Sequence, residues 1–82
     1  MSHRLVPTYI DELLGGIFEP LKPNVYWSEG ILIIELKGKK DKLGMSLNVP
    51  EELNTFDEFQ AVSNEIVRGF EREIIKRGID TL

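Results

Sequence analysis

Residues 25–49 decide the fold, and they read VYWSEGILIIELKGKKDKLGMSLNV. Three runs rich in β-branched, aromatic and other apolar residues are separated by two polar stretches that each contain a glycine. Such runs favour β-strands, and short polar stretches with glycine favour the turns between them. We therefore predict a three-stranded antiparallel meander with strands at residues 25–27, 31–37 and 43–49.

The third of these strands alternates between apolar and polar positions. Leu43, Met45, Leu47 and Val49 share one face, and Gly44, Ser46 and Asn48 share the other. An alternation of period two is typical of a strand with one face in the core and one face toward water. The third strand therefore predicts a sheet that is covered on one side only.

The second strand is apolar on both faces. Leu32, Ile34 and Leu36 share one face, while Ile31 and Ile33 share the opposite face with Glu35. If the sheet is covered on one side only, Ile31 and Ile33 lie on the uncovered side. An aromatic residue from the first strand would lie beside them, and the sequence leaves open whether it is Tyr26 or Trp27.

A helix is predicted before the strands. Pro7 and Thr8 open it, with Thr8 as the capping residue. Gly15 and Gly16 are weak helix formers that either end or bend this helix. One apolar stripe at helical spacing is expected to face the core, and it consists of Ile10, Leu13, Leu14, Ile17 and Phe18.

A longer helix is predicted after the strands. Thr55 and Glu58 form a capping box at its start, and Gly78 is the expected residue just past its end. Residues 56–77 would span about 33 Å, which exceeds the roughly 23 Å of a seven-residue strand. Its apolar stripe is Phe59, Val62, Ile66, Phe70 and Ile74, widened by Phe56, Val67 and Ile75.

These elements predict an α+β fold of order α-β-β-β-α, with both helices packed on one face of the meander. Residues 1–82 form a single domain, and we expect residues 1–6 and 79–82 to be loosely ordered. The element order resembles that of the double-stranded-RNA-binding domain. That family grips RNA with a lysine-rich start to its second helix, whereas residues 51–58 here read EELNTFDE. The resemblance therefore supports the fold and not an RNA-binding activity.

Composition narrows the function classes. The chain has no cysteine, and its net charge of −4 arises entirely in residues 51–82, which hold four basic and eight acidic residues. An acidic chain is not attracted to phosphate backbones in general. No apolar run is long enough to cross a membrane, and no signal peptide is recognisable, so we expect a cytoplasmic protein, in a host cell if it is viral.

The sequence offers no catalytic arrangement, and we expect no enzyme, cofactor or metal site. The single histidine, His3, lies near the end of the chain, and no serine lies in a nucleophile motif. Carboxylates gather at the start of the second helix, where they favour the helix dipole. We therefore interpret Glu51, Glu52, Asp57, Glu58 and Glu65 as a solvated helix face and not as an acid–base pair.

Exposed apolar residues instead predict a small protein-interaction module. We expect a homodimeric adaptor, chaperone or regulatory protein whose partner is a second copy or another protein. Large exposed apolar patches usually mark interfaces. The overhanging end of the second helix is a further candidate contact. The predicted interface residues are Tyr26, Trp27, Ile31, Ile33, Phe70 and Ile74.

A cluster of lysines gives an alternative function. Lys37, Lys39, Lys40 and Lys42 place four positive charges within six residues. Such a cluster docks phosphate or an acidic protein surface in some proteins, and in others it is a solvated loop that discourages edge-to-edge pairing. Because Asp41 dilutes the cluster and no arginine or aromatic residue is interleaved, we favour the solvated loop and keep nucleic-acid binding as the alternative.

Overall fold

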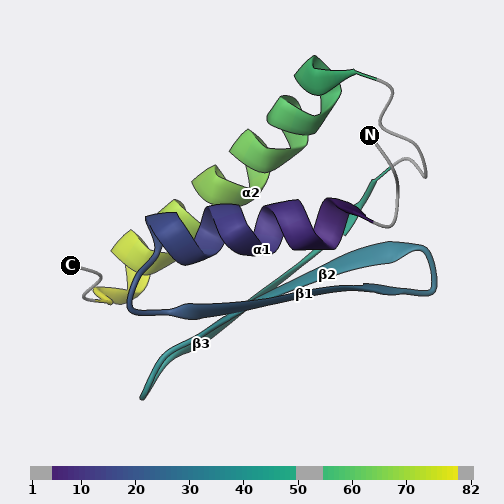
Figure 1. The fold of residues 1–82 in the computed structure, drawn as a ribbon. Helices are drawn as coiled ribbons and strands as arrows, with labels where there is room; N and C mark the ends of the chain where they lie inside the picture. The colour runs from purple at the N-terminus through teal and green to yellow at the C-terminus, as the bar shows by residue number, and fades with distance from the viewer. Residues whose placement is uncertain (1–4, 50–54, 80–82) are drawn as a thin grey trace.

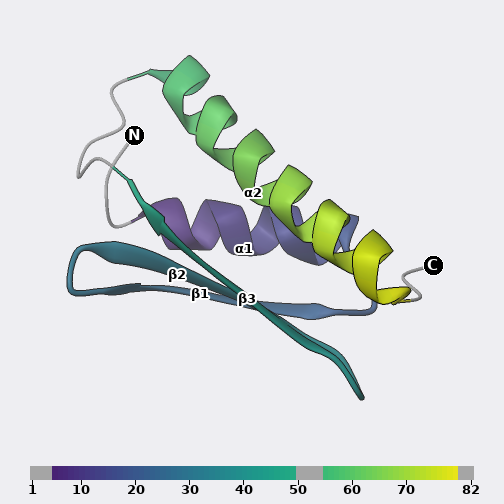
Figure 2. The same ribbon diagram turned by 180° about the vertical axis from the view of Figure 1, so that it is seen from behind.

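A computed structural model describes residues 5–49 and 55–79. It confirms the predicted α+β fold, with two helices and an open, antiparallel three-stranded sheet in the order β1-β2-β3 (Figure 1). Both helices lie on the same side of the sheet in the two opposite views (Figures 1 and 2). The elements along the chain are α1 (Val6–Ile17), β1 (Lys22–Ser28), β2 (Ile31–Lys37), β3 (Lys42–Asn48) and α2 (Phe56–Arg77).

The β1–β2 hairpin closes with the two-residue turn Glu29-Gly30. Both residues have positive φ, 50° and 81° respectively. Two central residues with positive φ give a turn whose twist matches the right-handed twist of the strands, and glycine tolerates this conformation without steric cost. The tight turn fixes the register, so that Ile33 pairs with Tyr26 and Leu32 pairs with Trp27.

The outer strands differ from the predicted ones at their starts. β1 begins at Lys22, three residues before the predicted start, and it includes Pro23. Proline removes one ladder donor, and this is tolerated because β1 is an edge strand. β3 begins at Lys42 and not at Leu43, so that Lys42 pairs with Lys37.

α1 begins earlier than the sequence predicts, and it does not end at Gly15 and Gly16. Its N-cap is Leu5, without a side-chain capping bond, so the predicted capping role of Thr8 is wrong. The helix passes through Gly15 and Gly16 and ends at Ile17, which is exposed. Since a Cβ on Gly15 would lie 3.8 Å from Pro23, this part of α1 packs closely on β1.

α2 follows the prediction at both ends. The Thr55 hydroxyl accepts a hydrogen bond of 3.1 Å from the Glu58 amide. Gly78 is left-handed, with a φ of 67°, and its amide donates to the carbonyls of Ile74 and Ile75. The buried apolar stripe of α2 is narrower than expected, because Phe56 and Ile75, which were predicted to widen it, are exposed.

The core lies between the sheet and the helices. Two edge-to-face ring pairs join the helices: Tyr9 with Phe59 at 6.1 Å and Phe18 with Phe70 at 6.0 Å. The core extends into the end that was expected to be loose, since Val6 is buried; residues 1–4 and 80–82 lie outside the described part. The buried hydrophobic residues are Val6, Ile10, Leu14, Phe18, Leu21, Leu32, Ile34, Leu36, Leu43, Val49, Ile66, Phe70 and Ile74.

Candidate interaction surface

The open face of the sheet lies opposite the two helices (Figures 1 and 2). Strand alternation places every second residue there, and the register aligns these residues in rows across the strands. Tyr26, Ile33 and Ser46 form one row, and Ile31 lies in the next row between Ser28 and Asn48. Tyr26 is 41% exposed, Ile31 is 37% exposed and Ile33 is partly buried. We call Tyr26, Ile31 and Ile33 the open-face patch.

Trp27 does not belong to this patch, which corrects the prediction that included it. Its cross-strand partner is Leu32, which is fully buried beneath the helices. Trp27 is partly buried and packs against the core. Because side chains alternate along a strand, placing Trp27 on the helix side necessarily places Tyr26 on the open side.

Phe70 and Ile74 are also not surface residues. They are 1% and 7% exposed in the monomer. Phe70 packs edge-to-face on Phe18, which directly follows α1, so this ring covers a residue that the sequence placed in the predicted interface. The large apolar side chains that α2 does expose are Phe56 and Ile75, at 71% and 78%.

A row of three lysines crosses the open face at the end remote from the β1–β2 turn. Lys37 pairs with Lys22 on one side and with Lys42 on the other. The sequence prediction missed Lys22, because that residue lies 15 positions before Lys37 and outside the predicted first strand. Only the register of the strands could reveal it. We call Lys22, Lys37, Lys39, Lys40 and Lys42 the lysine end.

The connection between β2 and β3 carries Lys39 and Lys40. The Gly38 amide donates a hydrogen bond of 2.8 Å to the Asp41 carbonyl, which closes a tight loop. A Cβ on Gly38 would lie 2.6 Å from Leu21 Cδ2, so the loop rests directly on the buried Leu21 side chain. The two loop lysines therefore project from a backbone that is fixed against the core.

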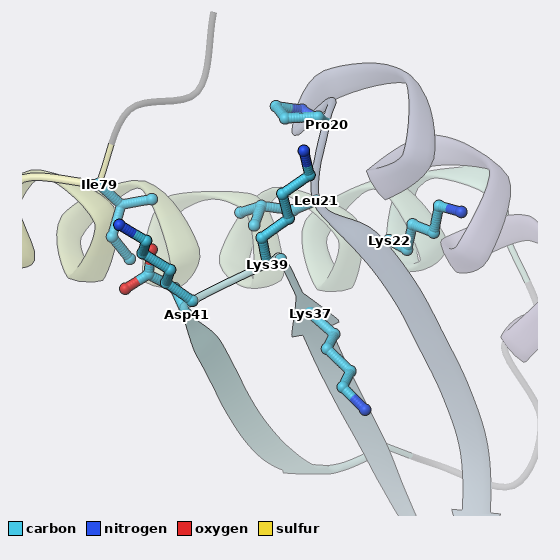
Figure 3. A pocket seen from close by; sticks show the side chains of 9 residues that line it. Pro20, Leu21, Lys22, Lys37, Lys39, Asp41 and Ile79 are labelled. Carbon is cyan, nitrogen blue, oxygen red and sulfur yellow. The ribbon is translucent and has the colours of Figure 1, made fainter.

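An open depression of about 810 Å³ lies beside this loop. Its lining combines apolar side chains with four of the five lysines, and Figure 3 shows Lys22, Lys37 and Lys39 pointing in different directions. The ammonium groups thus spread over a surface and do not converge on one small anion. The lining residues are Pro20, Leu21, Lys22, Lys37, Gly38, Lys39, Lys40, Asp41 and Ile79.

One polar row separates the lysine row from the open-face patch. It contains Asn24, Glu35 and Gly44, and the Asn24 side-chain amide donates a hydrogen bond of 3.2 Å to Glu35. At the outer edge, the Arg77 guanidinium donates to the Lys42 carbonyl at 3.3 Å. The open face therefore has an apolar part near the turn and a cationic part at its other end.

Within residues 5–49 and 55–79, no group of three or more His, Cys, Asp and Glu side chains is arranged to hold a metal ion. Asp57 and Glu58 lie exposed in the first turn of α2, and Glu73 pairs with Arg77 at 2.7 Å. His3, Glu51 and Glu52 lie outside the described residues.

No helix in the described part of the chain is long and apolar enough to cross a membrane.

Comparison with models of protein families, with curated proteins and with solved structures finds no match for this chain.

Proposed function

We propose that this chain is a non-enzymatic protein-interaction module that forms a two-fold homodimer through the open face of its sheet. The supporting observation is the open-face patch, where Tyr26, Ile31 and Ile33 lie side by side on the face opposite both helices. Exposed apolar clusters of this kind mark association surfaces. A domain this small, without disulfides, gains stability from association that its own core supplies only sparingly.

The distribution of charge on the open face favours a second copy as the occupant. Positive charge lies at the lysine row, and Glu29 lies at the opposite end of the β1–β2 hairpin. A two-fold axis in the interface, perpendicular to the strands, would bring each patch onto the other. The same axis would keep the two lysine rows apart, at opposite ends of the dimer.

The size of the face predicts a weak dimer. Three strands of seven residues cover about 14 Å by about 23 Å, or about 320 Å² in projection. A standard interface buries about 800 Å² on each partner. We therefore expect a dimer that dissociates in the micromolar range, in equilibrium with the folded monomer.

Sedimentation equilibrium over a range of protein concentrations tests the dimer. The unaltered chain should approach twice the protomer mass at high micromolar concentration. Ile33→Asp should remain monomeric, because the patch would then bury an unpaired charge. Ile33 suits this substitution because it lies in the middle strand, on the side away from the core, and is only partly buried.

Ile75→Asp is the matched control. It introduces the same change at an exposed isoleucine of α2, outside the open face. This variant should dimerise like the unaltered chain. A strict monomer at every concentration, or a dimer that Ile75→Asp disrupts and Ile33→Asp does not, would overturn the proposed interface.

A further inference from the structure

We propose that the lysine end binds an acidic protein segment that carries carboxylates next to leucine-like apolar side chains. This goes beyond the homodimer, because it assigns a second surface and the chemistry of a second partner. Two observations carry it: positive charge gathered across three strands and a loop, and apolar surface within the same depression.

The positive charge of the lysine end is not neutralised internally. In the part of the chain that the structure describes, none of its five ammonium groups forms an ion pair. Among residues 5–49 and 55–79, Asp41 is the one carboxylate that lines the depression, and Glu35 in the neighbouring row accepts a hydrogen bond from Asn24. Five lysines against these two carboxylates leave a net attraction for an anionic partner.

The lysine row is unfavourable in the isolated chain. Like charges directly opposite one another destabilise a sheet, and here two such pairs share the central Lys37. Carboxylates of a bound segment lying across the strands would relieve both repulsions at once. Binding would then convert an unfavourable feature of the fold into a favourable contact.

Apolar side chains in the depression define the rest of the partner. Pro20, Leu21 and Ile79 line it beside the lysines. No aromatic side chain is among the lining residues in the described part of the chain, so bases would find no ring there on which to stack. The net charge of −4 also opposes a long polyanion. A segment with both carboxylates and aliphatic side chains fits this surface better than a nucleic acid does.

The proposed dimer leaves this surface accessible. Lys37 lies four residues along β2 from Ile33, about 13 Å away. An axis through the patch therefore places the two lysine ends at opposite extremes of the dimer. Each dimer would bind two acidic segments, as expected of an adaptor.

The test is an amide-resolved NMR titration of the full chain with an acidic peptide of alternating glutamate and leucine. Amide shifts should concentrate at residues 21–22 and 37–42. Replacing every leucine of the peptide by serine should weaken binding. A single-stranded oligothymidylate or oligouridylate of similar charge should bind more weakly than the leucine peptide.

Two double variants distinguish the effect of charge at the lysine end from the effect of the net charge of the whole chain. The double change Lys22→Glu with Lys39→Glu should weaken peptide binding by about tenfold or more. Arg68→Glu with Arg72→Glu changes the net charge equally on the outer face of α2, where both residues line a separate depression, and should leave binding nearly unchanged.

Several results would overturn the proposal. These are the absence of shifts at the lysine end, equal binding of the serine peptide, and tighter binding of an oligonucleotide than of the leucine peptide. Repeating the titration with Ile33→Asp distinguishes the two proposals, because peptide binding should persist in a monomer. Failure of the dimer would therefore leave this test intact.

Discussion

Lys22 stands directly opposite Lys37, at the edge of the sheet and on its open face. The same side chain on an isolated strand would be an ordinary solvated lysine. Lys22 differs from such a lysine because the strand register aligns it with Lys37 and Lys42 in one row. Two adjacent pairs of like charges lower the stability of the sheet, and the same positive charges attract a negatively charged partner.

Lys22→Glu should therefore raise the stability of the unliganded chain. The substitution turns one repulsive pair into an attractive pair at a solvent-exposed position, which is worth about 0.5 kcal/mol. For a domain of this size, that gain raises the thermal midpoint by about 2–4 °C. Thermal unfolding followed by circular dichroism at low ionic strength measures the change.

Lys40→Glu is the control for this measurement. Lys40 lies in the β2–β3 connection and has no cross-strand partner, so the same change in net charge should alter the midpoint less. A Lys22→Glu variant that is less stable than the unaltered chain would contradict the interpretation of the lysine row as unfavourable.

At the level of secondary-structure elements, Gly69 determines how closely α2 approaches the sheet. A Cβ at this position would lie 2.4 Å from the terminal methyl group of Met45 in β3. The missing side chain lets the middle of α2 rest on β3, while Ile66 and Phe70 on either side are buried. A glycine inside a helix lowers its intrinsic stability by about 1 kcal/mol, and close packing offsets that loss here.

The effect of a substitution at Gly69 on the free energy of unfolding should depend on the size of the new side chain. Gly69→Ala should change the free energy of unfolding little, because the flexible end of Met45 can move and alanine favours the helix. Gly69→Leu should destabilise the domain by about 1–3 kcal/mol, since the larger side chain forces the helix away from β3. Urea unfolding gives both values.

Gly16→Ala serves as the comparison. Gly16 lies in α1 with open space where the Cβ would be, so alanine should stabilise the chain by about 0.5–1 kcal/mol. A Gly69→Leu variant as stable as the unaltered chain would contradict the close crossing of α2 over β3.

The molecule as a whole consists of two layers, with a sheet that is covered on one side (Figure 2). The covered side holds the core, and the other side exposes the open-face patch together with the lysine row. In such an arrangement, association through the uncovered side adds to the stability of each protomer. Stability and oligomeric state should therefore be linked.

The thermal midpoint of the unaltered chain should accordingly rise with protein concentration by a few degrees between the low and high micromolar range. Ile33→Asp should remove this dependence, and Ile75→Asp should retain it. Differential scanning calorimetry at several concentrations provides the measurement. An identical midpoint at all concentrations, for every variant, would count against the homodimer.

Local sequence patterns were sufficient to predict those features of the fold that depend on a single helix or strand. The capping box at Thr55 and the left-handed Gly78 mark the limits of α2, because both act through backbone groups of that helix alone. The alternation in β3 separates the buried Leu43 from the exposed Gly44 and Ser46, because neighbouring side chains on a strand point to opposite faces. The element order and the one-sided sheet follow from such patterns.

Contacts between elements decided the candidate surfaces. No local signal distinguishes Tyr26 from Trp27; pairing with the partly buried Ile33 or the fully buried Leu32 does so. Phe70 packs against Phe18, the residue after α1, although the two lie 52 positions apart in the chain.

The sequence by itself thus determined the order of the helices and strands, both ends of α2 and the side of the sheet that is dry, since each is set by short-range periodicity and backbone capping. The tertiary structure alone decided which aromatic residue reaches the open face, that Phe70 is buried in the core, and that Lys22 joins Lys37 and Lys42. The physical reason is that register and helix–helix packing bring together residues that are distant along the chain, and their environment exists only in the folded molecule.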